Sequence, residues 1–230
     1  MFWDVDMHPF LLSADDLLRG GPWATRSARP VRVLLHLCAF VCVFGVLYGG
    51  VMGAFAGITG QRLLQVIYSA LKVPLLLGVT FLVSLPSFFV LNTLAGVRDD
   101  FAQALRSLAA TQAALTLILA SLAPFTALWY ASNSAYQSAI LFNALMFAIA
   151  SVVAQFLLKR LYRPLIRRNR NHRWLMRAWL VLFAFVGIQM GWLLRPFIGN
   201  PDAPTSFFRQ DMWGNAYEYV ARMIWHVVAR

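Results

Sequence analysis

The residues that could perform chemistry in this sequence are few and lie far apart. His36 lies inside an apolar segment, where an imidazole could bind a metal ion, a haem or a quinone. A haem held by two histidines needs a second histidine at membrane depth, and the other three histidines lie outside the apolar segments. We therefore interpret His36 as a structural histidine, and we expect neither a metal site nor a cofactor.

The polar residues near the carboxyl terminus do not form a catalytic group. Asp202, Asp211, Glu218 and His226 are scattered, and their spacing does not bring a nucleophile, a base and an acid together. We find no glycine-rich phosphate loop and no metal-binding spacing. We expect that the protein is not an enzyme. A membrane-bound enzyme that acts on lipid is the least supported class.

Glycines recur at every fourth residue of the first apolar segment, which places them on one face of a helix. They are Gly45, Gly49, Gly53 and Gly57. Small residues at this spacing let a second helix backbone approach closely. The pattern predicts a helix-packing seam, whose partner is either another helix of this chain or another subunit. Pro86 and Pro124 lie well inside two other apolar segments, where they predict kinks with or without a substrate cavity.

The stretch from Lys159 to Arg177 is strongly basic and contains no acid. Its eight cations are Lys159, Arg160, Arg163, Arg167, Arg168, Arg170, Arg173 and Arg177. A loop this basic between spanning helices stays on the cytoplasmic side of a membrane. Asp99 and Asp100 fall on the same side, where they could pair with it. The stretch predicts a docking surface for anionic lipid or for an acidic partner, and its charge does not choose between the two.

The composition is that of an integral membrane protein. Hydrophobic residues make up 60% of the 230 residues, whereas a soluble domain is about 45–50% apolar. The formal net charge is +11, but the basic residues cluster at the ends of apolar segments. That pattern is typical of membrane topology and anionic headgroups, and it argues against nucleic-acid binding. We therefore expect membrane lipids as partners and no nucleic acid.

Five segments are long enough to cross about 30 Å of hydrocarbon, so we predict an all-α bundle of five transmembrane helices. They are Val33–Ala56, Val73–Ala95, Leu108–Ala131, Ile140–Leu158 and Trp174–Leu194. This transmembrane domain covers residues 31–195 and contains the basic loop 159–177. Residues 61–72 have apolar positions at helical spacing, which predicts a short interfacial segment that leads into the second span.

The basic residues also predict the orientation of the bundle. With a cytoplasmic amino terminus and an outside carboxyl terminus, 14 basic residues lie inside and six lie outside, as the positive-inside rule requires. The six are Arg62, Lys72, Arg195, Arg209, Arg222 and Arg230. Residues 1–30 lack the apolar core of a cleavable signal peptide. We expect a multi-pass protein of a bacterial-type inner membrane.

A short amphipathic helix is predicted near each terminus. In the cytoplasmic segment 1–30, Ser13 and Asp16 form a pattern like a capping box that would start a helix, and Gly20-Gly21 would end it. In the outside tail 196–230, residues 196–204 form a rigid turn region because they combine three prolines with a glycine. Trp213–Arg230 then has apolar residues at helical spacing, which predicts a helix at the membrane surface or one packed against the bundle or a partner.

In the stretch Leu91–Ser121, Phe101, Gln103, Leu105 and Arg106 follow an F-x-Q-x-L-R pattern after a loop that contains Gly96, and a span rich in small residues comes next. This stretch resembles the Yip family of five-pass membrane proteins. The resemblance implies a cytoplasmic amino terminus and a role in membrane organisation or trafficking. The basic fourth loop and the outside tail depart from the family pattern.

Two functions are expected from the sequence. The first is a non-enzymatic structural or anchoring subunit of a larger membrane assembly, with other membrane proteins as partners. The glycine seam motivates it, as does the lack of acids in the predicted span interiors, because coupled transporters need ionisable groups there. The alternative is a transporter or channel for a lipid or small molecule, which the prolines and the intramembrane amides motivate.

Overall fold

The structure, a computed structural model, describes residues 7–21, 30–60, 62–200 and 205–208. Throughout these residues the regular structure is helical, without strands. The α-helices are α1 (Met7–Leu18), α3 (Pro30–Gly53), α4 (Arg62–Leu94), α5 (Phe101–Ser132), α6 (Tyr136–Arg168) and α7 (Asn171–Leu193). The 3-10 turn η1 (Ala54–Ala56) follows α3, and the 3-10 turn η2 (Arg98–Asp100) precedes α5. The helices α3 to α7 are long and apolar enough to cross a membrane, which confirms the predicted helical class and the number of candidate spans.

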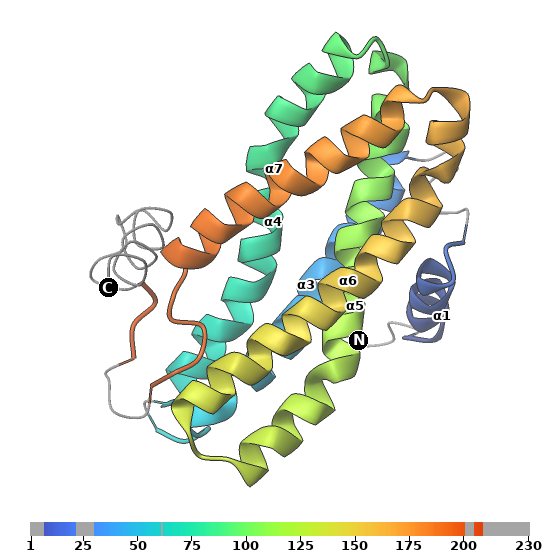
Figure 1. Cartoon of the computed structure of the whole chain (residues 1–230). Coiled ribbons are helices and arrows are strands. Elements are labelled where there is room, and N and C mark those ends of the chain that lie inside the picture. Colours follow the sequence, from blue (N-terminus) through green and yellow to red (C-terminus); the bar gives the residue numbers. More distant parts are fainter. Residues whose placement is uncertain (1–6, 22–29, 61, 201–204, 209–230) are drawn as a thin grey trace, which may run out of the picture.

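The helix α5 forms the centre of the bundle. In its most apolar stretch 61% of the residues are buried, against 17–28% in the other four candidate spans. It packs against α3 and α6, while α3 also packs against α4, and α4 against α7 (Figure 1). Many of its buried positions carry small side chains, among them Ala104, Ala110, Ala113, Ala114 and Ala123. Small side chains let neighbouring backbones approach closely, so the sequence of α5 suits its central place.

Three helices are longer than the sequence predicted. α4, α5 and α6 have 33, 32 and 33 residues, or about 50 Å each at 1.5 Å per residue. The predicted segment 61–72 is helical from Arg62 onward, and it forms the first turns of α4 in one helix with the second span. The helices also run through Pro86 and Pro124 without a break. Each long helix is therefore longer than a hydrocarbon core of about 30 Å requires.

The amino-terminal helix α1 lies along the side of the bundle (Figure 1). It starts at Met7 instead of the predicted Ser13, and it ends just before the predicted stop, where Gly20 has φ +73°. Its buried Ala14 and Leu17 join a core formed with α3, α5 and α6. Phe10 meets the ring of Phe44, halfway along α3, with 6.0 Å between the ring centroids. The chain is already helical before Ser13, so the predicted capping pattern does not mark the start of α1.

The glycine ladder of α3 faces α4 at three of its four positions. A Cβ atom at Gly45 would lie 3.3 Å from Pro74, and one at Gly53 would lie 2.7 Å from Ser69. A Cβ atom at Gly49 would lie 2.9 Å from the Cα of Ala70. Gly57 instead follows η1 with φ +107°, and a Cβ atom there would meet no described atom within 4 Å. Another helix of the same chain therefore covers the seam at these three positions.

We predict that Gly49→Ala destabilises the bundle while Gly50→Ala does not. The new methyl group at position 49 would press on the backbone of α4, which cannot move aside as a side chain can, and overpacking of this kind costs about 1–3 kcal/mol. A Cβ atom at Gly50 meets no described atom within 4 Å. Thermal unfolding of both variants in detergent measures the difference, and equal melting temperatures would show that the seam is looser than described.

Candidate functional site

The most elaborate polar structure is a segment that crosses one end of the bundle. Residues 195–200, here called the strap, follow α7 and connect it to the first turns of α4 and α6 (Figure 1). Four strap carbonyls accept hydrogen bonds from side chains of those two helices. The donor and acceptor pairs are Lys72 to Pro196, Ser69 to Phe197, Tyr136 to Ile198 and Arg62 to Asn200. The strap is non-helical, so its carbonyls lack the backbone N–H donors of a helix, and side-chain donors take their place.

The spacing of polar residues in α4 explains how one helix holds most of the strap. Arg62, Gln65, Ser69 and Lys72 recur at intervals of three or four residues, which places them on one face. Gln65, Ser69 and Lys72 are fully or almost fully buried there. A Cβ atom at Gly199 would lie 2.7 Å from Cγ of Gln65, so a glycine suits this close crossing. The Lys72 ammonium also lies 5.1 Å from the centre of the Phe207 ring.

A cavity of about 900 Å³ lies behind the strap. Its walls come from the end of α3, the first turns of α4 and α6, the strap, and residues 205 and 206. The larger apolar side chains in its lining are Met52, Leu76, Ile140, Phe147, Phe197 and Ile198. The polar ones are Arg62, Gln65, Tyr136, Asn143, Arg195, Asn200, Thr205 and Ser206. This volume, with an apolar wall and a few polar groups, suits a small organic molecule or part of a lipid.

The ionic groups in the cavity lining are two guanidinium groups. Arg62 donates to the carbonyl of Asn200 at 3.0 Å. Arg195 stacks on Trp192, with its guanidinium carbon 3.6 Å from the ring centre. None of the described lining residues is acidic. A guanidinium carries five N–H donors, and it can hold a carbonyl and a carboxylate or phosphate together. The lining therefore fits a molecule with an anionic end and an apolar body.

A buried hydrogen-bond network supports the wall of the cavity. The Tyr48 hydroxyl donates to Oδ1 of Asn143 at 3.0 Å, and Nδ2 of Asn143 donates to the hydroxyl of Tyr130. Tyr130 in turn donates to the carbonyl of Met52 at 3.3 Å. The network joins α3, α5 and α6 beside the cavity and fixes the orientation of the Asn143 amide.

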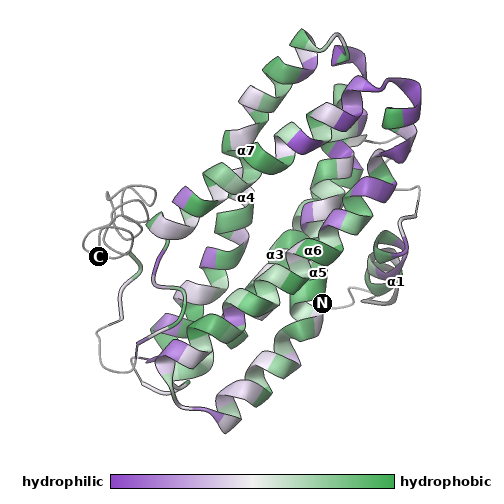
Figure 2. Cartoon of the chain, in the orientation of Figure 1, coloured by the Kyte–Doolittle hydropathy of each residue, from purple (hydrophilic) through white to green (hydrophobic). Residues whose placement is uncertain are grey.

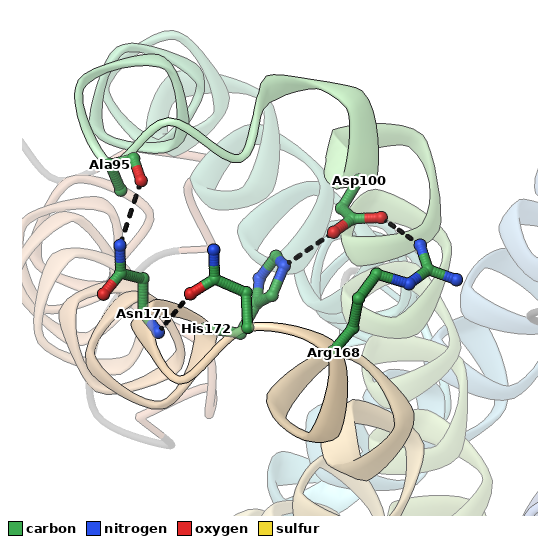
Figure 3. A network of polar contacts seen from close by, with 6 residues as sticks. Ala95, Asp100, Arg168, Asn171 and His172 are labelled. Atoms are coloured by element: carbon green, nitrogen blue, oxygen red, sulfur yellow. Dashed lines mark hydrogen bonds and ion pairs between the residues drawn. The ribbon is translucent and has the colours of Figure 1, made fainter.

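A second polar cluster joins two turns at the opposite end of the bundle, which we call the basic end (Figure 3). Asp100 of η2 accepts a hydrogen bond from Nε2 of His172 at 3.1 Å and forms an ion pair with Arg168. Asn171 donates to the carbonyl of Ala95 at 3.1 Å. His172 is fully buried. The predicted pairing of the acidic turn with the basic loop is confirmed for Asp100, and the role of His172 was missed.

All eight cations of the predicted docking surface are exposed. Figure 2 shows hydrophilic residues gathered where α6 ends and α7 begins. Arg168 forms the ion pair with Asp100. The side chain of Arg160 lies against the end of α1, where a Cβ atom on Gly20 would be 3.0 Å from it. The other six lie along the last turns of α6 and the first turns of α7.

The strap and its cavity were not predicted from the sequence. Arg62, Lys72 and Arg195 were interpreted as topological charges, although the polar spacing from Arg62 to Lys72 was a usable signal. His36, interpreted as structural, lies in an aromatic cluster with Phe10 and Phe40 at centroid distances of 5.5 and 4.8 Å. In the described ranges we find no group of three His, Cys, Asp or Glu residues that could hold a metal ion. The predicted helix Trp213–Arg230 lies outside the described residues.

The fold and the cavity define a helical protein with five candidate membrane spans and, at one end, a largely apolar cavity that contains two guanidinium groups. No family model, no curated protein and no solved structure matches the chain.

We predict that Asp100→Ala lowers the stability of the protein and that Asp99→Ala does not. The first change leaves the buried imidazole of His172 without its acceptor, and an unsatisfied buried group costs about 1–3 kcal/mol. Asp99 is its exposed neighbour in the same turn and carries the same charge, so it controls for charge loss. Thermal unfolding in detergent compares them, and equal losses would contradict a specific role for Asp100.

We also predict that Asn143→Ala destabilises the wall of the cavity by about 1–3 kcal/mol, because it leaves the hydroxyls of buried Tyr48 and half-buried Tyr130 short of a partner. Gln137→Ala is the matched control, since Gln137 is an exposed amide one to two turns earlier on α6. Chemical unfolding followed by tryptophan fluorescence measures both variants. A loss at Gln137 as large as that at Asn143 would count against the network.

Proposed function

We propose that this chain is a non-enzymatic multi-pass membrane protein that binds an anionic amphiphile, such as a lipid with one free acyl chain, in the cavity behind the strap. The observation that carries the proposal is the pair of guanidinium groups, Arg62 and Arg195, in a cavity whose remaining wall is largely apolar. Its described lining has no acid, histidine, cysteine or lysine that could act as a catalytic base. The proposal develops the predicted transporter or channel for a lipid or small molecule.

The two kinds of wall suggest how the ligand lies. The anionic group would bind near Arg62 and Arg195, where charge-assisted hydrogen bonds are strong. The apolar chain would lie against Leu76, Ile140 and Phe147, away from the strap. Ile140 is 41% exposed on the side of the bundle, so the cavity wall continues into the surface that would face lipid. An amphiphile could therefore enter from the membrane.

The orientation is part of the same proposal. Eight cations gather at the basic end, and such loops stay in the cytoplasm because they are costly to translocate. The strap and its cavity would then face the outer leaflet of a bacterial-type inner membrane. A lipid-binding role also agrees with the membrane organisation that the Yip resemblance implies.

The predicted anchoring subunit now has less support. Its main motivation was the glycine ladder, and α4 of the same chain packs against Gly45, Gly49 and Gly53. A stable assembly with other membrane proteins would have to use other surfaces. Purification from native membranes separates the two functions, because an anchoring subunit would carry stoichiometric protein partners.

We predict that the purified protein binds lysophosphatidylglycerol more tightly than a monoacylglycerol with the same chain. The double variant Arg62→Gln/Arg195→Gln should lose roughly tenfold or more in affinity, because each charge-assisted hydrogen bond contributes about 1.5–3 kcal/mol. Native mass spectrometry in a neutral detergent measures the bound lipid. The control Arg32→Gln/Arg98→Gln removes the same charge at the basic end and should bind as the unmodified chain does.

The apolar wall has its own matched pair. Phe147→Ala, in the cavity lining, should weaken binding, whereas Phe156→Ala, on the exposed surface of the same helix, should not. Thermal stability without lipid is measured for every variant, to separate lost binding from lost fold. Equal binding of the charged and neutral lipids, or equal binding by the cavity and control variants, would refute the proposal.

A further inference from the structure

One face of α6 changes from apolar to cationic along its length. Val152 and Phe156 are 57% and 65% exposed, and Arg160, Arg163 and Arg167 follow them at intervals of three or four residues. This spacing keeps all five on one side of the helix. The opposite side carries buried residues, among them Leu158, Leu161, Tyr162 and Leu165. Packing of that side against the bundle fixes the direction in which the cations point.

The helix α7 shows the same change in the reverse direction. Arg170, Arg173 and Arg177 are exposed at its start, together with Trp174 at 55%. Val181, Phe185 and Ile188 continue this exposed side and are 71%, 57% and 54% exposed. His172, Leu175, Met176 and Trp179 are buried on the other side. Two neighbouring helices therefore present cationic rows that continue directly from apolar surfaces.

The continuity sets the depth of the cations relative to a membrane. The apolar stretches from Val152 to Phe156 and from Val181 to Ile188 suit contact with acyl chains, so the first cations beyond them lie at the level of the headgroups. Lys159 illustrates the boundary, because its ammonium lies 5.6 Å from the centre of the Phe156 ring. An exposed tryptophan at this level, Trp174, is typical of the membrane interface.

We propose that these two cationic rows bind the headgroups of anionic phospholipids in the leaflet at the basic end. The rows are Lys159, Arg160, Arg163 and Arg167 on α6, and Arg170, directly before α7, with Arg173 and Arg177 on α7. An acidic protein is the other candidate partner, but it would have to approach side chains that lie beside the acyl-chain surface. Arg168 is not included, because Asp100 holds it. The proposal is independent of the cavity at the strap end.

The test compares two triple variants that lose equal charge. Arg160→Gln/Arg163→Gln/Arg167→Gln removes the α6 row, and Arg19→Gln/Arg32→Gln/Arg98→Gln removes three exposed arginines outside both rows. Each protein is reconstituted in nanodiscs of phosphatidylcholine and phosphatidylglycerol and then transferred to neutral detergent. The retained lipids are counted by native mass spectrometry. Both leaflets of the nanodisc carry the same lipid mixture, so the lipid count does not depend on the orientation of the protein in the cell.

We expect the row variant to retain roughly tenfold less phosphatidylglycerol relative to phosphatidylcholine, since its three cations lie together in one row that continues from the apolar surface and act on the same headgroups. The control variant should retain as much as the unmodified chain, and high salt should reduce retention in both, because it screens the charges. Equal retention by the two variants would overturn the proposal. So would unchanged lipid retention with loss of a co-purified acidic protein, which would assign the rows to that partner.

A single change covers the case in which the triple variant does not fold. Arg163→Gln lies in the middle of the α6 row, and Arg98→Gln is its control. A loss of phosphatidylglycerol that is smaller than that of the triple variant but specific to Arg163→Gln supports the proposal. Equal retention by the two single variants overturns it.

Discussion

A backbone carbonyl that leaves a helix inside an apolar bundle must find a new donor, because each unsatisfied group costs several kcal/mol where water is excluded. This constraint governs the strap end of the protein. Residues 195–200 are non-helical, and four of their carbonyls accept bonds from Arg62, Ser69, Lys72 and Tyr136. The polar face of α4, the burial of Lys72 and the cavity behind the strap all follow from meeting this need with side chains.

The two ends of the bundle solve different problems. At the strap end, donors on α4 and α6 serve backbone acceptors, and the remaining polar groups line a cavity. At the basic end, one carboxylate, Asp100, ties the α4–α5 turn to the α6–α7 turn through His172 and Arg168. That contact orders the two turns and leaves the other cations of the loop exposed.

The sequence predicted what depends on the chain locally and missed what depends on distant contacts. Hydropathy was sufficient to predict five long helices. The glycine intervals from Gly45 to Gly53 were sufficient to predict a helix-packing seam, but they did not identify the helix that packs against it. The predicted start of α1 at Ser13 was wrong, since the chain is already helical at Met7, and the packing of Phe10 and Leu17 against α3 and α5 could not be predicted from local pattern. The cavity was missed because Arg62 and Arg195 are 133 positions apart in the chain, and only the folded strap brings both into one lining.

Arg62 belongs both to the strap and to the cavity lining. A molecule that engages this guanidinium acts on the same group that holds the Asn200 carbonyl. If the cavity binds the proposed amphiphile, its occupancy and the position of the strap are therefore coupled, and thermodynamic linkage makes the coupling reciprocal. A ligand that changes the equilibrium between two positions of the strap by some factor has affinities for those two positions that differ by the same factor. Because the strap continues directly from α7, a change in the position of the strap also affects the end of that helix.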